Sequence, residues 1–250
     1  MDLPEVAIPT YQRADILLTH TLPYLLSQNY PAEKITIFVA SEQECETYKN
    51  KLPVGSYKEL VVGMPGLLNQ RRVISEHYKP GQIILQMDDD VKGLKILRAN
   101  QTFLDLIRWG CWLMESKQCG LFGVMPTDDA RRFSEDLTSH LAHIVGSFFL
   151  CVNTKDCIPN IQEKEDYERT ILYFKKYGSV LRWNGAGVST RYMETPGGLQ
   201  QPGRPERMAS EVRYLIETYP DYCKERTKKN TADILLNWRA KALPKIISEI

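Results

Sequence analysis

The stretch Ile83–Val91, with the sequence IILQMDDDV, joins an apolar run to three consecutive aspartates. The run Ile83–Met87 is rich in residues that favour strands and predicts a buried β-strand. Three carboxylates that lie close together and partly buried cannot all stay ionised without a compensating cation. The stretch therefore predicts a core strand that ends at a charged site.

Strand-like and helix-like segments alternate on both sides of this stretch. Strands are predicted for 5–8, 35–40, 59–63 and 82–87, and apolar residues near a 3.6-residue period predict helices between them. This alternation predicts one α/β domain with a mostly parallel central sheet covered by helices on both faces. Ligands of such sheets bind beyond the carboxyl ends of the strands, which is where the three aspartates lie.

The rest of the chain continues the pattern and then changes. Pro23 predicts a kink or a break within the first helical segment, and Gly178 is typical of a helix C-terminus. The Gly- and Pro-rich segment 184–205 predicts a long loop. The further predicted elements are helices at 103–117, 163–178, 207–218 and 232–241, and strands at 119–125 and 146–153.

Composition excludes several classes of protein. The chain has 250 residues, of which 43% are hydrophobic and 25% charged, with a net charge of +1, so it has the composition of an ordinary globular protein. The overall charge favours no particular partner. No apolar run approaches the length of a membrane span, and residues 1–13 do not resemble a signal peptide. The six cysteines lack zinc-like spacing, so we expect reduced thiols in a cytoplasmic protein.

The acidic cluster itself indicates a metal. Mg²⁺ and Mn²⁺ take oxygen ligands and bridge a few carboxylates to substrate phosphates. Because side chains alternate along a strand, Asp88 and Asp90 are expected on one side and Asp89 on the other. Asp88 and Asp90 are therefore the predicted metal ligands. The alternative is a solvated acidic turn that precedes the next element.

Four ordered segments resemble metal-dependent glycosyltransferases of the GT-A fold. QMDDDV resembles their D-x-D motif, and AIPTYQRADIL (residues 7–17) resembles the first strand and turn that cradle the donor nucleotide. PGLLNQRR (65–72) resembles the helix start that closes over the nucleotide. EKEDYERTILYFKKYGSVLRW (163–183) resembles the E-D motif with its helix and following strand. The resemblance spans about residues 5–200.

The resemblance implies a role for each motif. It implies a nucleotide-binding half (1–100), an acceptor and catalytic half (101–205) and a helical C-terminal extension (206–250). The donor would be a nucleotide-sugar, with UDP as the expected nucleotide. The donor-binding residues would be Pro9, Thr10, Tyr11, Arg13, Arg72, Asp88 and Asp89, of which Asp88 is also a predicted metal ligand.

The two arginines are chosen because arginine binds phosphate bidentately, and Arg71 is a further candidate. Ordinary surface ion pairs are the alternative for each arginine. Asp166 of the E-D pair would be the general base in inverting members of the family, and Glu165 would be a packing or helix-start residue. Without the resemblance, this acidic segment would be interpreted as a charged first helical turn.

A narrower resemblance concerns the acceptor. The opening 8–40 and the loop ETPGGLQ (194–200) are similar to TET/JBP-associated glycosyltransferases of phages and kinetoplastids. That group implies transfer to 5-hydroxymethylcytosine or 5-hydroxymethyluracil in DNA. Trp183 or Tyr192 would then stack on an extruded base. The candidate phosphate contacts are Arg191, Arg204, Arg207, Arg213, Lys224, Arg226, Lys228 and Lys229. Solvated helices are the alternative interpretation of these charges.

The histidines depart from the GT-A pattern. His140 and His143 are interpreted as core or surface residues, and no histidine follows His143 to supply a third metal ligand. Glu194 or Gln200 are possible substitutes, or the metal relies on the D-x-D motif and the substrate alone.

Three other functions compete with sugar transfer to DNA. One is glycosyl transfer to a glycan or protein. A second is a phosphohydrolase of the haloacid dehalogenase type, but that nucleophile motif sits on the first strand and has Thr or Val where this chain has Lys92. The third is a binding module that has lost catalysis.

Overall fold

The computed structural model describes residues 2–190, 197–199, 202–228 and 231–242. Its main sheet has the strand order β3-β2-β1-β4-β8-β6-β9-β5, with β7 beside β9. These strands are β1 (Glu5–Pro9), β2 (Ile35–Val39), β3 (Glu59–Val62), β4 (Ile83–Met87), β5 (Val91–Ile96), β6 (Leu121–Met125), β7 (Leu137–Thr138), β8 (Phe148–Val152) and β9 (Leu181–Thr190). Six of them (β3, β2, β1, β4, β6 and β9) run in one direction, which confirms the predicted mostly parallel sheet.

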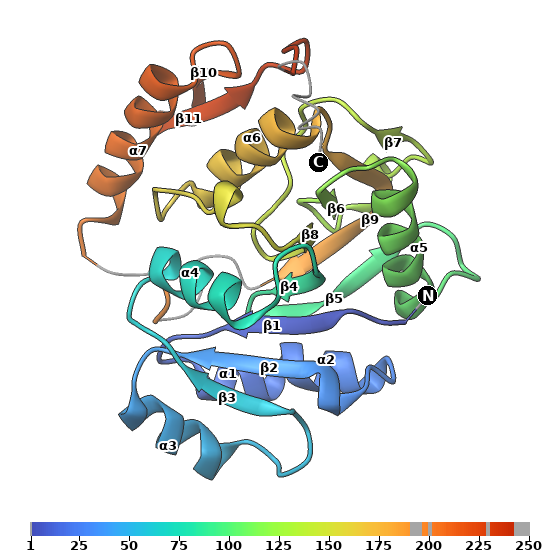
Figure 1. Cartoon of the computed structure of the whole chain (residues 1–250), viewed down its shortest axis with the longest axis vertical. Helices are drawn as coiled ribbons and strands as arrows, with labels where there is room; N and C mark the ends of the chain where they lie inside the picture. Colours follow the sequence, from blue (N-terminus) through green and yellow to red (C-terminus); the bar gives the residue numbers. More distant parts are fainter. Residues whose placement is uncertain (1, 191–196, 200–201, 229–230, 243–250) are drawn as a thin grey trace.

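Helices cover both faces of the sheet, as predicted (Figure 1). The helices are α1 (Ala14–Thr19), α2 (Thr21–Ser27), α3 (Glu42–Lys51), α4 (Leu67–His77), α5 (Phe103–Ser116), α6 (Glu165–Tyr177) and α7 (Arg204–Thr218). Short 3-10 helices lie at Ala32–Lys34, Ala130–Arg132 and Lys155–Cys157. α1, α2, α3 and α5 share one hydrophobic core, whereas α4, α6 and α7 share the other. No helix in the described part of the chain is both long and apolar enough to cross a membrane.

The side chains of β4 point alternately to the two faces of the main sheet. Leu85 and Met87 are buried in the core with α1, α2, α3 and α5, and Ile84 is buried in the opposite core. Gln86 lies on the same side as Ile84, where it accepts a hydrogen bond from Arg71 of α4 (2.7 Å). β4 therefore carries one polar side chain toward α4 just before the three aspartates begin.

Several local predictions are confirmed by the helix ends. α1 and α2 are two short helices, and Pro23 lies in the first turn of α2, where proline is tolerated. The break itself falls at His20. Gly178 ends α6 in the left-handed conformation with φ of 81°, as a glycine at that position permits.

Two segments differ from prediction. Residues 184–190, expected to be a loop, continue β9 and pair with β5. The glycines there serve close packing, since a Cβ on Gly187 would lie 1.8 Å from the carbonyl oxygen of Thr127. The segment expected to be a helix at 232–241 instead begins with β11 (Thr231–Leu236), which pairs antiparallel with β10 (Cys223–Lys228).

The C-terminal part packs beyond α6. Figure 1 shows α7 and the β10–β11 hairpin together at one end of the molecule, with α6 between them and the main sheet. Leu215 of α7 and Ile234 of β11 are buried in the same core as Phe174 of α6. The extension predicted for 206–250 therefore combines a helix with a hairpin. All six cysteines are buried and unpaired, as the spacing predicts.

Candidate active site at the carboxyl ends of the strands

The three aspartates form a turn between β4 and β5. Thr21 at the start of α2 clamps this turn, because its hydroxyl donates to the Asp88 carbonyl (2.7 Å) and accepts from the Val91 N–H (2.9 Å). The residues therefore do not alternate as they would along a strand. The clamp fixes the backbone of the acidic cluster against the first helical layer.

The three carboxylates point toward two different arginines. Arg13 Nη1 lies 3.3 Å from Asp89 and 3.5 Å from Asp90, whereas Arg71 Nη2 lies 3.6 Å from Asp88. Asp89 therefore does not face away from Asp90, as strand alternation led us to expect. Asp89 and Asp90 share Arg13, and Asp88 lies toward α4.

Burial makes the cluster electrostatically costly. Burial raises the pKa of Asp88 to about 8, with Arg71 opposing the rise and the charges of Asp90 and Asp89 adding to it. Burial also raises the pKa of Asp89 to about 6 and raises that of Asp90, with Arg13 opposing both. Two arginines thus do not fully compensate three carboxylates.

The loop after β1 holds Asp89. Thr10 is buried, and its hydroxyl donates to Asp89 Oδ2 (2.7 Å) while it lies 2.6 Å from the hydroxyl of Tyr48 on α3. Pro9 is the last residue of β1 and is buried, and Tyr11 is half-buried. The Thr10 hydroxyl that we expected to meet the nucleotide is therefore bonded to the acidic cluster. Nucleotide contact by Pro9 and Tyr11 stays a prediction.

Arg71 and Arg72 lie in different environments, and contact of either with the donor diphosphate stays a prediction. Arg72 is exposed, and no hydrogen bond or ion pair among the described residues joins it to the acidic cluster. Arg71 is buried and contacts Asp88, Gln86 and Glu165, the last at 3.1 Å. The two arginines are consecutive in α4, and consecutive helical residues differ by about 100° in direction, so their side chains lie on different faces of the helix.

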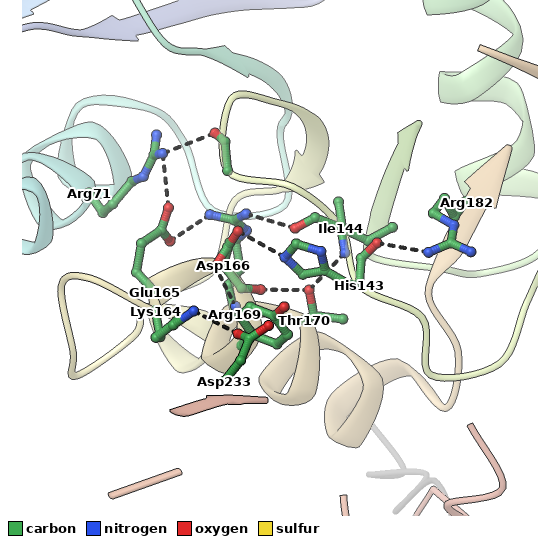
Figure 2. Close-up of polar contacts among 12 residues, drawn as sticks. Arg71, His143, Ile144, Lys164, Glu165, Asp166, Arg169, Thr170, Arg182 and Asp233 are labelled. Carbon is green, nitrogen blue, oxygen red and sulfur yellow. Dashed lines mark hydrogen bonds and ion pairs between the residues drawn. The ribbon is translucent and has the colours of Figure 1, made fainter. Parts of the chain in front are cut away.

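Glu165 lies between two guanidinium groups (Figure 2). Its Oε1 accepts from Arg71 Nη2 (3.1 Å), and its Oε2 accepts from Arg169 Nη1 (2.6 Å), one helical turn along α6. All three side chains are about 5% exposed or less. Arg169 also lies over the ring of Phe149, 3.7 Å from its centroid. Glu165 is thus a buried structural anion, as expected of a packing or helix-start residue.

Asp166 faces away from these arginines and meets His143. Its Oδ2 lies 2.8 Å from His143 Nε2, and its Oδ1 accepts from the Tyr167 N–H (3.0 Å). Burial acts to raise the pKa of Asp166, but the charge and hydrogen bond of His143, with Arg169 and Lys164, outweigh burial and lower it to about 2. Asp166 is therefore an ionised, partly accessible carboxylate at the first turn of α6.

A helix-capping carboxylate comes from α7. Glu211 accepts hydrogen bonds from the backbone N–H groups of Gln162, Glu163 and Lys164 at 2.7–3.0 Å. These donors precede or begin α6, whose own N-cap side chain makes no capping bond. The orientation of the first turn, including Asp166, therefore depends on the C-terminal extension.

The basic residues expected to follow a DNA backbone have mixed positions. Arg204 and Arg207 both bind Glu163, at 2.8 Å, and Arg226 binds Asp233 at 2.9 Å. Arg213 and Lys224 are exposed. The side chains of Arg191, Lys228 and Lys229 lie outside the described residues. Three arginines predicted to contact DNA phosphates therefore already have a carboxylate partner.

The aromatic residues expected to stack on a base are also constrained. Trp183 is fully buried, so its predicted stacking on an extruded base is wrong. Tyr192, Glu194 and Gln200 lie outside the described residues, as does most of the loop that resembles the DNA-modifying group. Gly198 of that loop is described, and its N–H donates to the Tyr11 carbonyl (3.1 Å) beside Arg13.

Sequence reasoning missed three residues of this site. His143 was interpreted as a core or surface residue because no neighbouring sequence signal pairs it with Asp166. Arg169 had a signal, since it follows Glu165 by four residues and such pairs lie on one helix face. Glu211 lies 47 to 49 positions after the backbone groups that it binds, and only the fold brings it there.

Comparison with solved structures identifies the fold. The chain resembles TarS 1–349 of S. aureus, with a TM-score of 0.52 and 13% identity over 88% of this chain and 68% of that chain. It also resembles glucosyl-3-phosphoglycerate synthase of Mycobacterium tuberculosis, with a TM-score of 0.54 and 11% identity over 97% and 89% of the two chains. Mannosyl-3-phosphoglycerate synthase of Rubrobacter xylanophilus gives 0.53 and 12% over 96% and 86%.

No protein-family model and no curated protein sequence matches the chain. At these identities the similarity establishes the fold alone. The chain has the GT-A fold of nucleotide-sugar glycosyltransferases, as the four motifs predicted.

Proposed function

We propose that this protein is a metal-dependent glycosyltransferase that moves a sugar from a nucleotide-sugar to a hydroxyl acceptor. The observation that carries this proposal is the link between the two acidic motifs. Arg71 contacts Asp88 of the first motif at 3.6 Å and Glu165 of the second at 3.1 Å. This contact brings Glu165, the neighbour of the proposed base Asp166, next to the proposed metal-binding cluster, although 76 positions separate Asp90 from Asp166 in the sequence, and it supports a single site.

The acidic cluster fits a hard divalent cation. Its ligand atoms are carboxylate oxygens, and the raised pKa values of Asp88 and Asp90 indicate negative charge that a cation would stabilise. No group of three potential ligands occurs in the described residues, so Asp88 and Asp90 would hold the metal together with donor phosphates. Bound Mn²⁺ or Mg²⁺ would act as a Lewis acid on the diphosphate leaving group.

The chain's own residues supply the other requirements of sugar transfer. Arg13 lies beside Asp89 and Asp90, where it would add positive charge next to the donor diphosphate. Asp166 would accept the proton of the acceptor hydroxyl as that oxygen attacks the anomeric carbon. Arg71 would keep the two motifs in register through Glu165.

The proposal also names a donor and an acceptor. A UDP-sugar is the proposed donor, since the similar synthase of Mycobacterium tuberculosis was solved with Mn²⁺, UDP-glucose and phosphoglyceric acid. The proposed acceptor is the hydroxymethyl group of a modified pyrimidine in DNA. It is supported by the narrower sequence resemblance and by exposed Arg213 and Lys224 on the extension that caps α6. A cytoplasmic location follows from such an acceptor.

A donor panel tests the proposal. UDP- and GDP-sugars are assayed with Mn²⁺ for hydrolysis and for transfer to hydroxymethylcytosine DNA, unmodified DNA and simple glycans. We expect turnover of a nucleotide-sugar that is lost in EDTA and in Asp90→Asn, which removes one metal ligand but keeps the side-chain volume. Glu46→Gln, an exposed substitution on α3, is the control and should keep full activity.

Other outcomes distinguish the competing functions. Equal turnover in EDTA and Mn²⁺ would contradict the metal mechanism. Release of phosphate from a phosphomonoester, with no turnover of any nucleotide-sugar, would instead indicate a phosphohydrolase. Nucleotide binding without any turnover would indicate a binding module.

A further inference from the structure

His143 is fixed beside Asp166 by contacts on several sides. Its ring stacks on Tyr167 of α6, with centroids 4.2 Å apart and planes inclined by 14°. Its carbonyl accepts from Arg182 of β9 (3.4 Å). The next residue, Ile144, donates its N–H to Thr170 (3.3 Å) and accepts from Arg169. Figure 2 shows the loop that carries His143 held against α6 by these bonds.

The pair formed by His143 and Asp166 is reachable from solvent. Each side chain is 21% exposed, in contrast with about 5% for Glu165. The hydrogen bond between them measures 2.8 Å, which is the distance of a well-formed bond to a charged acceptor. A carboxylate in this position can receive an acceptor hydroxyl while one of its oxygens stays bonded to the imidazole.

The other charged groups around the pair are neutralised in part by partners of their own. Arg169 donates to Glu165, and the Lys164 ammonium lies 2.8 Å from Asp233. Arg226, on the same hairpin as Asp233, also binds that carboxylate.

The remaining titratable groups near the pair are Tyr167, which stacks on the imidazole, and His140 in the same loop. The pKa of His140 is lowered by burial and by Arg182. His143 is the imidazole bonded directly to Asp166.

We propose that His143 is a positioning residue for the base Asp166, and that protonation of its imidazole switches that base off. The inference rests on the proposed function. With neutral His143, the Nε2–H orients the carboxylate and leaves it able to take a proton. With charged His143, the ion pair stabilises the ionised carboxylate and weakens it as a base, in line with the lowered pKa of Asp166.

The chemical step balances without another reactant. The acceptor O–H bond breaks and its proton goes to Asp166 while the acceptor oxygen forms a bond to the anomeric carbon. The bond from that carbon to the diphosphate oxygen breaks, and its electron pair leaves with the nucleoside diphosphate. His143 exchanges no electrons and acts only through Asp166.

Two substitutions separate the hydrogen bond from the charge. His143→Gln keeps an N–H donor but cannot be protonated, so transfer should lose its fall toward acidic pH. His143→Phe keeps the stacking on Tyr167 but loses the bond, so kcat should fall by about 10- to 100-fold at every pH, with KM for the donor unchanged. His140→Gln, in the same loop but exposed, is the matched control and should keep the wild-type pH profile.

A readout independent of activity tests the pair itself. In proton NMR, the His143 Nε2–H held by the carboxylate should give a downfield signal that is present in the wild type and absent in Asp166→Ala. This signal is expected even where no nucleotide-sugar is turned over, so failure of the proposed function and failure of this inference are distinguishable.

Three results would overturn the inference. One is an unchanged signal in Asp166→Ala. Another is an acidic limb that persists in His143→Gln. The third is a loss in His143→Gln as large as in Asp166→Asn, which would make the imidazole itself the base.

Discussion

Glu165 and Asp166 are adjacent in the sequence but occupy opposite environments. Glu165 is bonded to Arg71 and Arg169 on the buried side of α6, and Asp166 meets His143 on its accessible side. Because consecutive helical residues differ by about 100° in direction, only one of the two can face the site. The resemblance favours Asp166 as the base, and Asp166 is the more accessible of the two carboxylates. No sequence pattern could supply its partner His143, which depends on tertiary packing.

Loss of the Glu165 charge should destabilise the fold. In Glu165→Gln, two buried guanidinium groups lose their shared anion, so we expect the free energy of unfolding to fall by about 3 kcal/mol. Chemical denaturation followed by circular dichroism measures it. Glu46→Gln, which breaks an exposed pair with Lys49, should cost at most about 0.5 kcal/mol. Equal costs for the two variants would show that the buried network is not stabilising.

Loss of the Asp166 charge should affect chemistry instead. Asp166→Asn keeps the shape of the side chain but removes the base, so transfer should fall by roughly 10²–10⁴-fold. Nucleotide affinity, measured by calorimetry with Mn²⁺, should stay close to that of the wild type because Asp166 does not contact the acidic cluster in the described structure. A large loss of nucleotide affinity would place Asp166 in the donor site.

Helix α6 joins the proposed base Asp166 to the C-terminal extension. Its first turn has no side-chain cap of its own, and Glu211 of α7 accepts from the backbone N–H groups of the three residues just before it, Gln162, Glu163 and Lys164. The position of the proposed base Asp166 is therefore expected to depend on the C-terminal extension. The strength of this dependence can be measured.

Removal of the long-range cap should loosen the first turn of α6. Glu211→Ala leaves three N–H groups without their carboxylate, and we expect a loss of about 1–2 kcal/mol of stability. Hydrogen exchange should become faster at the amides of Gln162, Glu163 and Lys164. Glu217→Ala, also on α7 but exposed, is the control. Equal protection of these amides in both variants would contradict the capping role.

The elements that the sequence predicted correctly are those with strong local patterns. β1 to β4 are apolar runs bounded by turns, and they lie within one or two residues of their predicted limits. The second part of β9, residues 184–190, was missed because its glycines, such as Gly187, are typical of loops but here permit close approach of another segment of the chain. β11 was missed because the stretch in which buried and exposed residues alternate is short. Ile234 and Leu236 are buried, and Leu235 between them is exposed.

At the scale of the whole molecule, many charged side chains form ion pairs with each other. Arg71, Arg169, Arg204 and Arg207 all bind carboxylates around the first turn of α6. Composition gave a near-neutral chain, and a count of basic residues in the C-terminal third could not show which of them face solvent. The proposed interaction with DNA would therefore rest on other cations, such as Arg213 and Lys224.

A salt series tests DNA as the acceptor. Phosphate contacts release counterions, so affinity for DNA should fall steeply with salt, and each lost contact should reduce the slope by about one unit. Lys228→Ala/Lys229→Ala should therefore flatten the slope by about two units while donor binding stays unchanged. Lys117→Ala is the control. Lys117 is exposed just after α5 and precedes the amino-terminal end of β6, whereas the site lies beyond the carboxyl ends of the strands, so its loss should leave the slope unchanged. A flat salt dependence in the wild type, or equal transfer to a glycan and to hydroxymethylated DNA, would exclude DNA as the specific acceptor and leave sugar transfer to another hydroxyl.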